Sequence, residues 1–221
     1  MIVLHGSAGS PYVARVRMLG YAKGIDIALR PAALGTPEFQ AMNPIGKMPV
    51  LEHNGFILPE SLIICEYLED LHPTPSMLGV TPQERALARL IPRTVDLYCA
   101  NLLSLLRAAS DSSFKIDEAT ERANLNKGLN ALEHFLQPTG YAARAELSLA
   151  DCVLVPWLYY GAKLASIGDD TLSRFAKLSR YIEMVADDPI AQRVWAEMDE
   201  AFRAFMTKWK AEQEAAAAQK D

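Results

Sequence analysis

The spacing of apolar residues in this 221-residue chain changes once, at the proline-rich stretch "HPTPSMLGV", residues 72–80. Before this stretch, short apolar runs alternate with helical periodicity, and after it the periodicity is helical throughout. A stretch that holds two prolines and a glycine and has no periodicity is typical of a linker. The sequence therefore predicts a mixed α/β domain at 1–74, a linker at 75–80, an all-helical domain at 81–210 and a frayed tail at 211–221.

Local signals predict the order βαβ, a short helix and ββα before the linker. The expected elements are a strand at 2–5, a helix at 11–23, a strand at 25–29, a short helix or turn from 36, two strands joined at 53–55 and a helix beyond residue 60. Gly24 is a residue that commonly ends a helix. Asn54-Gly55 is a strong signal for a tight hairpin. These elements suffice for a small sheet with helices packed on it.

Helix-start signals recur after the linker. Thr81-Pro82-Gln83-Glu84 has the pattern of a capping box with proline at the first helical position. We expect one long helix from Thr81, a second over 117–136, a very apolar helix that opens at "SLAD", 148–151, and a further helix from Asp188-Pro189.

Composition narrows the class of protein. Half of the residues are hydrophobic, 22% are charged and the net charge is −5, which argues against nucleic acid as a partner because a basic face would be needed. We find no apolar run long enough to cross a membrane and no secretory signal, so we expect a cytoplasmic protein with no membrane partner. The three cysteines are predicted to be buried, reduced thiols, and the four histidines lack metal-ligand spacing, so no metal is assigned.

The first stretch that could carry chemistry is "GSAGSPYVARVRMLG", residues 6–20. Ser10-Pro11 is typical of a capped helix start. The same geometry would let a serine hydroxyl donate a hydrogen bond to an anion at the positive end of the helix dipole. Gly6 and Gly9 do not fit the Gly-x-Gly-x-x-Gly pattern of a dinucleotide cradle. Capping and anion binding therefore both stay open for Ser10.

Two further stretches offer backbone groups to a ligand. In "NPIGKMPVLEHNG", residues 43–55, a proline within a strand favours an edge or a bulge, where free backbone groups could pair with an extended peptide. In "LPESLIICEYLE", residues 58–69, Glu60-Ser61 stands at a helix start. Ser61 could cap that helix, or its hydroxyl and the following N–H groups could bind a carboxylate.

Together these motifs resemble the thioredoxin-like domain of the cytosolic glutathione transferases. The shared features are a serine-proline turn after the first strand, N-P-x-G-K-x-P-V-L before a hairpin, and E-S-x-x-I-x-x-Y-L on the next helix. The helical half also resembles this family, with S-x-A-D at the start of its apolar helix. The resemblance covers nearly the whole chain and implies a bacterial serine-type member with a thioredoxin-like α/β N-terminal domain and an all-α C-terminal domain.

The resemblance also implies roles for individual residues. Ser10 matches the residue that faces the sulfur of glutathione, with Ser7 as the alternative because the turn is longer than the shortest versions in the family. Ser148 and Asp151 match a structural capping box. Five residues match the glutathione site: Lys47 near the glycyl carboxylate, Met48 and a cis Pro49 beside the cysteinyl backbone, and Glu60 and Ser61 at the γ-glutamyl end.

A small hydrophobic electrophile is expected between the two domains. Tyr98, Asn101 and Leu105 are spaced to share one face of the long helix from Thr81, and Tyr12 lies near the sulfur corner, so these four are predicted to line the pocket. The resemblance further implies a homodimer.

Several activities remain open at this stage. "RVR", 15–17, resembles the zeta class, which uses glutathione to isomerise maleyl compounds, but Ser10-Pro11-Tyr12 and Glu60-Ser61 depart from the Ser-Ser-x-Cys and Gln-Ser of that class. Theta-like transfer, β-aryl ether cleavage and dehalogenation are carried out by serine-type relatives. A non-catalytic binding scaffold of the same fold is the alternative of another class.

Overall fold

The computed structural model describes the backbone of residues 1–218 and the side chains of 1–209 and 211. Its sheet has the strand order β2-β1-β3-β4. The strands are β1 (Ile2–His5), β2 (Ile27–Arg30), β3 (Val50–His53) and β4 (Phe56–Pro59). β1 pairs in parallel with β2 and antiparallel with β3, and β3 pairs antiparallel with β4. β3 thus lies inside the sheet, so the expectation that Pro49 marks an edge strand is wrong: the proline stands just before the strand.

Three helices accompany the sheet: α1 (Pro11–Lys23), α2 (Pro37–Met42) and α3 (Ser61–Leu71). α1 begins with Pro11 and ends at Gly24, whose φ of 66° is left-handed. This ending explains why β2 starts two residues later than predicted. The Ile25 amide donates to the Gly20 carbonyl at 2.8 Å, so Ile25 completes the helix end instead of joining the strand.

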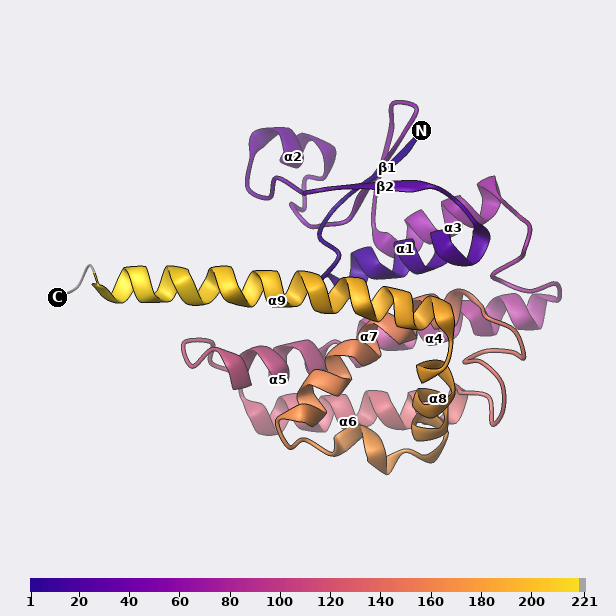
Figure 1. Ribbon diagram of the computed structural model, residues 1–221. Helices are drawn as coiled ribbons and strands as arrows, with labels where there is room; N and C mark the ends of the chain where they lie inside the picture. Colours follow the sequence, from indigo (N-terminus) through magenta and orange to yellow (C-terminus); the bar gives the residue numbers. More distant parts are fainter. Residues whose placement is uncertain (219–221) are drawn as a thin grey trace.

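The rest of the described chain is helical. The helices are α4 (Pro82–Tyr98), α5 (Asn101–Ser110), α6 (Glu118–Phe135), α7 (Leu149–Ser166), the short 3₁₀ helix η1 (Thr171–Arg174), α8 (Ala176–Ala186) and α9 (Pro189–Ala218). α7 is almost entirely buried, and both α4 and α1 pack on it. Figure 1 shows α9 running along the junction between the sheet region and the other helices. The fold is therefore the predicted one, a thioredoxin-like domain followed by an all-helical domain.

Two boundaries of the helical half differ from expectation. The helix from Thr81 ends at Tyr98, where α6 lies so close that a Cβ added at Gly128 would be 2.1 Å from the Tyr98 carbonyl oxygen. The Cys99 carbonyl accepts a hydrogen bond from the indole Nε1 of Trp157 at 3.2 Å, so the chain can turn there without a buried orphan group. α9 continues to Ala218, so the backbone of 211–218 is helical, and 219–221 lies outside the described residues.

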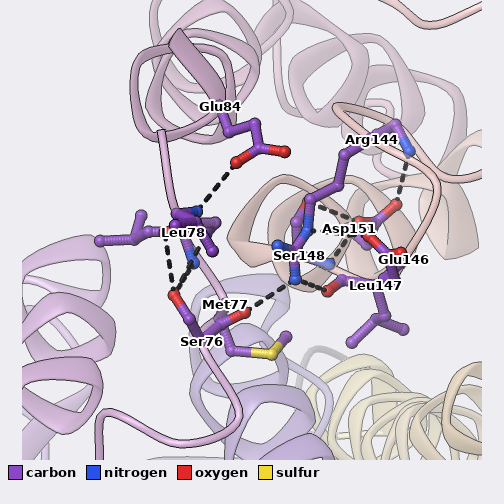
Figure 2. A network of polar contacts seen from close by, with 12 residues as sticks. Ser76, Met77, Leu78, Glu84, Arg144, Glu146, Leu147, Ser148 and Asp151 are labelled. Carbon is purple, nitrogen blue, oxygen red and sulfur yellow. Dashed lines mark hydrogen bonds and ion pairs between the residues drawn. The ribbon is translucent and has the colours of Figure 1, made fainter. Parts of the chain in front are cut away.

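The linker is bonded to both halves. Glu69 of α3 accepts hydrogen bonds from the Met77 amide at 3.0 Å and the Ser76 hydroxyl at 2.9 Å. From the other side, the Leu149 amide donates to the Met77 carbonyl at 2.7 Å and Arg144 donates to the Ser76 carbonyl at 2.7 Å. Figure 2 shows these linker residues facing the loop that leads into α7. The two halves are thus held at this junction by hydrogen bonds from both sides.

The start of α7 carries the expected structural box. The buried Asp151 carboxylate accepts hydrogen bonds from the Ser148 amide at 2.8 Å and the Ser148 hydroxyl at 2.7 Å (Figure 2). It also accepts from the Ala142 amide and the Tyr181 hydroxyl, both at 2.8 Å. Four donors satisfy this buried carboxylate, which fixes the helix start and the preceding loop.

Candidate functional site

Strand register brings three motifs to one end of the sheet. His5, the last residue of β1, pairs with Val50, the first residue of β3, and Val50 pairs with Pro59, the last residue of β4. The turn after β1, the Met48–Pro49 segment before β3 and the Glu60-Ser61 pair after β4 therefore leave the sheet at the same end. The first of these segments lies about forty residues before the second in the sequence, so only the pairing of β1 with β3 brings the two together.

Ser10 stands at the N-terminus of α1. It is the N-cap residue, yet its side chain makes no capping hydrogen bond, which removes the purely structural interpretation of this serine. Its backbone is tied down, because the Ser10 amide donates to the Ser7 carbonyl at 2.9 Å and the Ser10 carbonyl accepts from Ala14 at 2.9 Å. The hydroxyl is therefore unused by the fold at a point where the helix dipole favours an anion.

The Met48–Pro49 peptide bond is cis, as the resemblance implies. Within the part of the chain that the structure describes, no backbone–backbone hydrogen bond involves Met48. The preceding loop is fixed by the Asn43 side chain, which donates to the Lys47 carbonyl at 2.7 Å. The Met48 amide and carbonyl are thus available to an extended, peptide-like ligand.

Glu60 and Ser61 form the start of α3. Glu60 has a φ of 70°, a conformation that is rare for a residue other than glycine, and such outliers gather at functional sites. Ser61 does not cap the helix but is its first residue, and its hydroxyl makes no hydrogen bond with the described residues. The first intrahelical bond comes from the Ile64 amide, so the N–H groups before it remain open to a carboxylate.

A cavity of about 530 Å³ lies beside the serine turn. Both Ser7 and Ser10 line it, together with Met48. The opposite wall comes from helices of the second half, with Leu103 and Leu106 on α5, Tyr160 on α7, and Ala201, Phe202, Phe205, Met206 and Trp209 on α9. Arg107, Ser110 and Asp111 line it at the end of α5. The wall facing the serines is mainly apolar, which suits an apolar electrophile next to a sulfur held at Ser10.

Tyr160 joins the helical wall to the serine turn. Its hydroxyl donates a hydrogen bond to the Gly9 carbonyl. Burial raises the pKa of Tyr160 to about 12, so the phenol keeps its proton at neutral pH. Gly9 also lies against α9, where an added Cβ would meet the Ala201 Cβ at 3.5 Å. The turn that carries the candidate catalytic serine is therefore positioned by α7 and α9.

The four residues predicted to line the electrophile pocket do not line this cavity. Tyr98, Asn101 and Leu105 do not share a helix face, because α4 ends at Tyr98 and α5 begins at Asn101. Tyr98 is 54% exposed, Asn101 donates to Glu121 at 2.7 Å, and Leu105 is buried and lines a different cavity, of about 570 Å³. Tyr12 lies against the Arg15 guanidinium, 4.9 Å from its ring centroid. The expected shared face on one helix is therefore wrong, since nothing local in the sequence marks the break at Cys99, and contact of the four residues with an electrophile stays a prediction.

Behind the serine turn, a buried ion pair connects the two domains. The Arg15 guanidinium of α1 makes two hydrogen bonds to the Asp96 carboxylate of α4, at 2.7 and 2.8 Å. Arg15 is almost fully buried, and burial together with Asp96 raises the pKa of the neighbouring Tyr12. This bidentate pair fixes α4 relative to α1. Arg15 belongs to the "RVR" motif, which is a partial signal, but no local pattern identifies Asp96 as its partner.

The cysteines of the chain are not placed to act as nucleophiles. All three are unpaired and buried, as predicted, and burial raises the pKa of Cys65 and of Cys99 to about 12. Burial also raises the pKa of Cys152. Their thiols are protonated at neutral pH and are inert. Among the described residues there is also no group of three or more metal-ligating side chains, and no helix long and apolar enough to cross a membrane.

Comparison with known proteins agrees with this geometry. The family model described as "Glutathione S-transferase, N-terminal domain" matches residues 4–76, and the model "Glutathione S-transferase, C-terminal domain" matches residues 94–189. The chain is 35% identical to the maleylacetoacetate isomerase of Mus musculus over 153 residues, which cover 64% of this chain and 69% of the relative. The chain belongs to the glutathione S-transferase family. Its curated relatives include glutathione S-transferases and maleylacetoacetate isomerases.

Other members of the family match over a larger share of the chain. A probable glutathione S-transferase of Glycine max is 28% identical over 218 residues, which cover 95% of this chain and 94% of the relative. The crystal structure of glutathione transferase F2 from Populus trichocarpa superposes with a TM-score of 0.77 at 19% identity and covers 90% of this chain and 100% of that one. The structural match shows the shared fold.

Proposed function

We propose that this glutathione S-transferase family member is a glutathione transferase that conjugates glutathione to a small hydrophobic electrophile. The observation that carries the proposal is the unbonded Ser10 hydroxyl at the start of α1, in a cavity whose other wall is apolar. The residues around it suit glutathione, because the open groups of Met48 can pair with a peptide backbone and the start of α3 can bind a carboxylate. A scaffold without catalysis would not need this hydroxyl to be kept free.

Ionising the glutathione thiol requires only a modest stabilisation of its anion by the protein. Glutathione supplies a thiol, whose pKa near ~8.5 leaves it only a few per cent ionised at neutral pH. Lowering that pKa by about two units takes ~2.7 kcal/mol of preferential stabilisation of the anion. A hydroxyl hydrogen bond to a charged group contributes ~1.5–3 kcal/mol, and the helix dipole adds ~0.3–1 kcal/mol. Ser10 therefore acts as a hydrogen-bond donor and need not accept a proton.

The remaining residues of the glutathione side bind and orient. Ser61 and the open N–H groups at the start of α3 hold the γ-glutamyl carboxylate, with Glu60 beside them. Met48 pairs with the cysteinyl backbone, and Pro49 fixes the direction of that segment. Lys47 is exposed and forms no ion pair with a described residue, so its ammonium group is free for the glycyl carboxylate. Ser7, which lines the same cavity, is the alternative donor to the sulfur.

A second candidate is glutathione-dependent cis–trans isomerisation of a maleyl compound. It is favoured by the 35% identity to a maleylacetoacetate isomerase. Residues 10–12 and Glu60 differ from the motifs of the isomerase class, and both positions lie on the glutathione side of the site. These differences favour transfer over isomerisation.

A panel of substrates tests the proposal. Turnover is measured with glutathione and, side by side, chlorodinitrobenzene, a maleyl compound and a β-aryl ether. Conjugation of chlorodinitrobenzene supports the transferase, whereas activity on the maleyl compound alone would give preference to the isomerase. Binding is measured separately on immobilised glutathione. No retention, together with no change in melting temperature when glutathione is added, would leave only a binding scaffold.

We also propose that the protein is a cytoplasmic homodimer. The family resemblance supports the dimer. Exposed apolar side chains on β4, α3 and α4 could be buried in an interface between two copies of the chain: Phe56, Ile63, Leu97 and Tyr98. Sedimentation at micromolar concentration is expected to give a species of about twice the 24.4 kDa chain mass. A species of the chain mass would contradict the dimer.

A further inference from the structure

The electrophile cavity is lined by a guanidinium group, that of Arg107, which makes no hydrogen bond with the described residues. Arg107 lines the cavity near the C-terminal end of α5. Its contacts with described residues are a stacking contact with Phe114, whose ring centroid lies 4.1 Å from the guanidinium carbon, and an ion pair with Asp111. That ion pair spans 4.0 Å between Nε and the carboxylate oxygen, which is too long for a hydrogen bond.

One oxygen of the Asp111 carboxylate already accepts two hydrogen bonds. The Oδ1 atom of Asp111 accepts hydrogen bonds from the Ser113 hydroxyl at 2.5 Å and the Ser113 amide at 2.9 Å. The Ser113 hydroxyl is the main cause that lowers the pKa of Asp111, so this side chain is ionised at neutral pH and its charge partly offsets that of Arg107. The N–H donors of Arg107 nevertheless make no hydrogen bond with the side chains and backbone that the structure describes, and a guanidinium has five of them in a fixed fork.

The rest of the cavity defines what could meet this group. Arg107 and Asp111 are the charged side chains among the described residues that line the cavity. The main wall is aromatic and aliphatic. Gly9 lies against Ala201, while the cavity continues along α9 to Trp209, eight residues or about 12 Å further along the helix axis. Ser10 and Arg107 line the same cavity of about 530 Å³, which is large enough for a ligand of aromatic size.

We infer that Arg107 binds a carboxylate of the electrophile, so that the site takes apolar or aromatic electrophiles that carry a carboxylate group. This inference rests on the proposed function, because it names the substrate class of the same cavity. A bidentate Arg–carboxylate pair supplies both energy and orientation. Its contribution is moderated here, because the Arg107 side chain is 63% exposed and water screens the pair.

The chain offers a matched control for Arg107. Arg174 has a side-chain exposure of 62%, pairs with Asp170 four residues away and lies outside this cavity. Arg107→Gln and Arg174→Gln therefore remove the same charge at similar exposure, and Arg174→Gln also removes a hydrogen bond to a carboxylate that Arg107 does not make. Arg107→Lys keeps the charge but lacks the fork, and Asp111→Asn removes the opposing charge while its carbonyl can still accept from Ser113.

The experiment compares kcat/KM for chlorodinitrobenzene and for its carboxylate analogue, chlorodinitrobenzoate. Arg107→Gln is expected to lower the value for the carboxylate ~10-fold and that for the neutral compound less than about twofold. Arg107→Lys should fall between, Asp111→Asn should raise the value for the carboxylate about two- to threefold, and Arg174→Gln should change neither. Equal losses on both substrates, no loss in Arg107→Gln, or the same loss in Arg174→Gln would overturn the inference.

A binding measurement separates this inference from the proposed function. The dinitrophenyl conjugate of glutathione and its carboxylate analogue are titrated by calorimetry into the wild type and the same variants. If neither electrophile is conjugated, the transferase proposal fails, yet tighter binding of the carboxylate conjugate that is lost in Arg107→Gln and weakened by salt supports the inference. Equal affinity of both conjugates for wild type and Arg107→Gln overturns it.

Discussion

The two walls of the electrophile cavity are built in different ways. The glutathione wall consists of groups that local turns leave unbonded: the Ser10 hydroxyl, the Met48 backbone and the first N–H groups of α3. The helical wall consists of side chains from α5, α7 and α9, and apart from Arg107 and Asp111 its members are neutral. The difference implies a division of labour, in which the first wall sets thiol reactivity and glutathione binding and the second sets the choice of electrophile.

The largest expected effect is on the glutathione wall. Ser10→Ala removes the proposed donor to sulfur and should lower kcat ~10²-fold with little loss of glutathione affinity. Steady-state kinetics with varied glutathione separates the two terms. Ser7→Ala is the matched control and should stay near wild type. If Ser7→Ala loses activity and Ser10→Ala does not, the catalytic role belongs to Ser7.

Ser61→Ala, on the same wall, should affect KM for glutathione and leave kcat nearly unchanged, the reverse of Ser10→Ala. The hydroxyl at the start of α3 is proposed to hold a carboxylate, so its loss should raise KM for glutathione ~10-fold while kcat changes less than about twofold. The melting temperature of the free enzyme should stay close to wild type, because the hydroxyl makes no hydrogen bond within the described chain. A lower kcat at unchanged KM would remove Ser61 from the binding role.

On the helical wall, Phe205→Ala should affect only the electrophile. Phe205 lines the cavity and is 60% exposed, so its truncation removes contact area without opening the core. KM for chlorodinitrobenzene is expected to rise ~3- to 5-fold, with KM for glutathione unchanged. Ile167→Ala, at 58% exposure beside the other cavity, serves as the control. A shift in glutathione KM would contradict the division between the walls.

Tyr160→Phe tests the hydrogen bond by which α7 of the helical wall holds the Gly9 carbonyl of the serine turn. Without the bond to the Gly9 carbonyl the serine turn is held less firmly, so we expect kcat to fall about threefold and the pKa of the bound thiol to rise by about half a unit. A loss confined to KM for the electrophile would instead make Tyr160 a simple lining residue.

The same difference explains which parts could be predicted from the sequence. The glutathione wall is marked by three local signals, each of which spans only a few residues: Ser10-Pro11, Met48-Pro49 and Glu60-Ser61. The pairing of His5, Val50 and Pro59 then brings these segments together. The sheet, the hairpin and most helix starts were predictable for the same reason, because caps and turns are encoded locally.

The helical wall lacks such signals. Leu106, Tyr160 and Phe202 lie in three helices, and a residue in an apolar helix gives no sign of whether it faces a cavity or the core. The break at Cys99 shows the limit most directly. No proline or glycine marks it, and the residues that pack against it, Gly128 and Trp157, are distant in sequence. The partnership of Arg15 with Asp96 is tertiary in the same sense.

The most direct test of the account is the pKa of the glutathione thiol in the binary complex, measured from the ultraviolet absorbance of the thiolate as pH is varied. For the wild type the account predicts a pKa about two units below that of free glutathione, and for Ser10→Ala a return upward by at least about one unit, with Ser7→Ala unchanged. A thiol pKa in Ser10→Ala equal to that of the wild type would contradict the proposed role of the Ser10 hydroxyl.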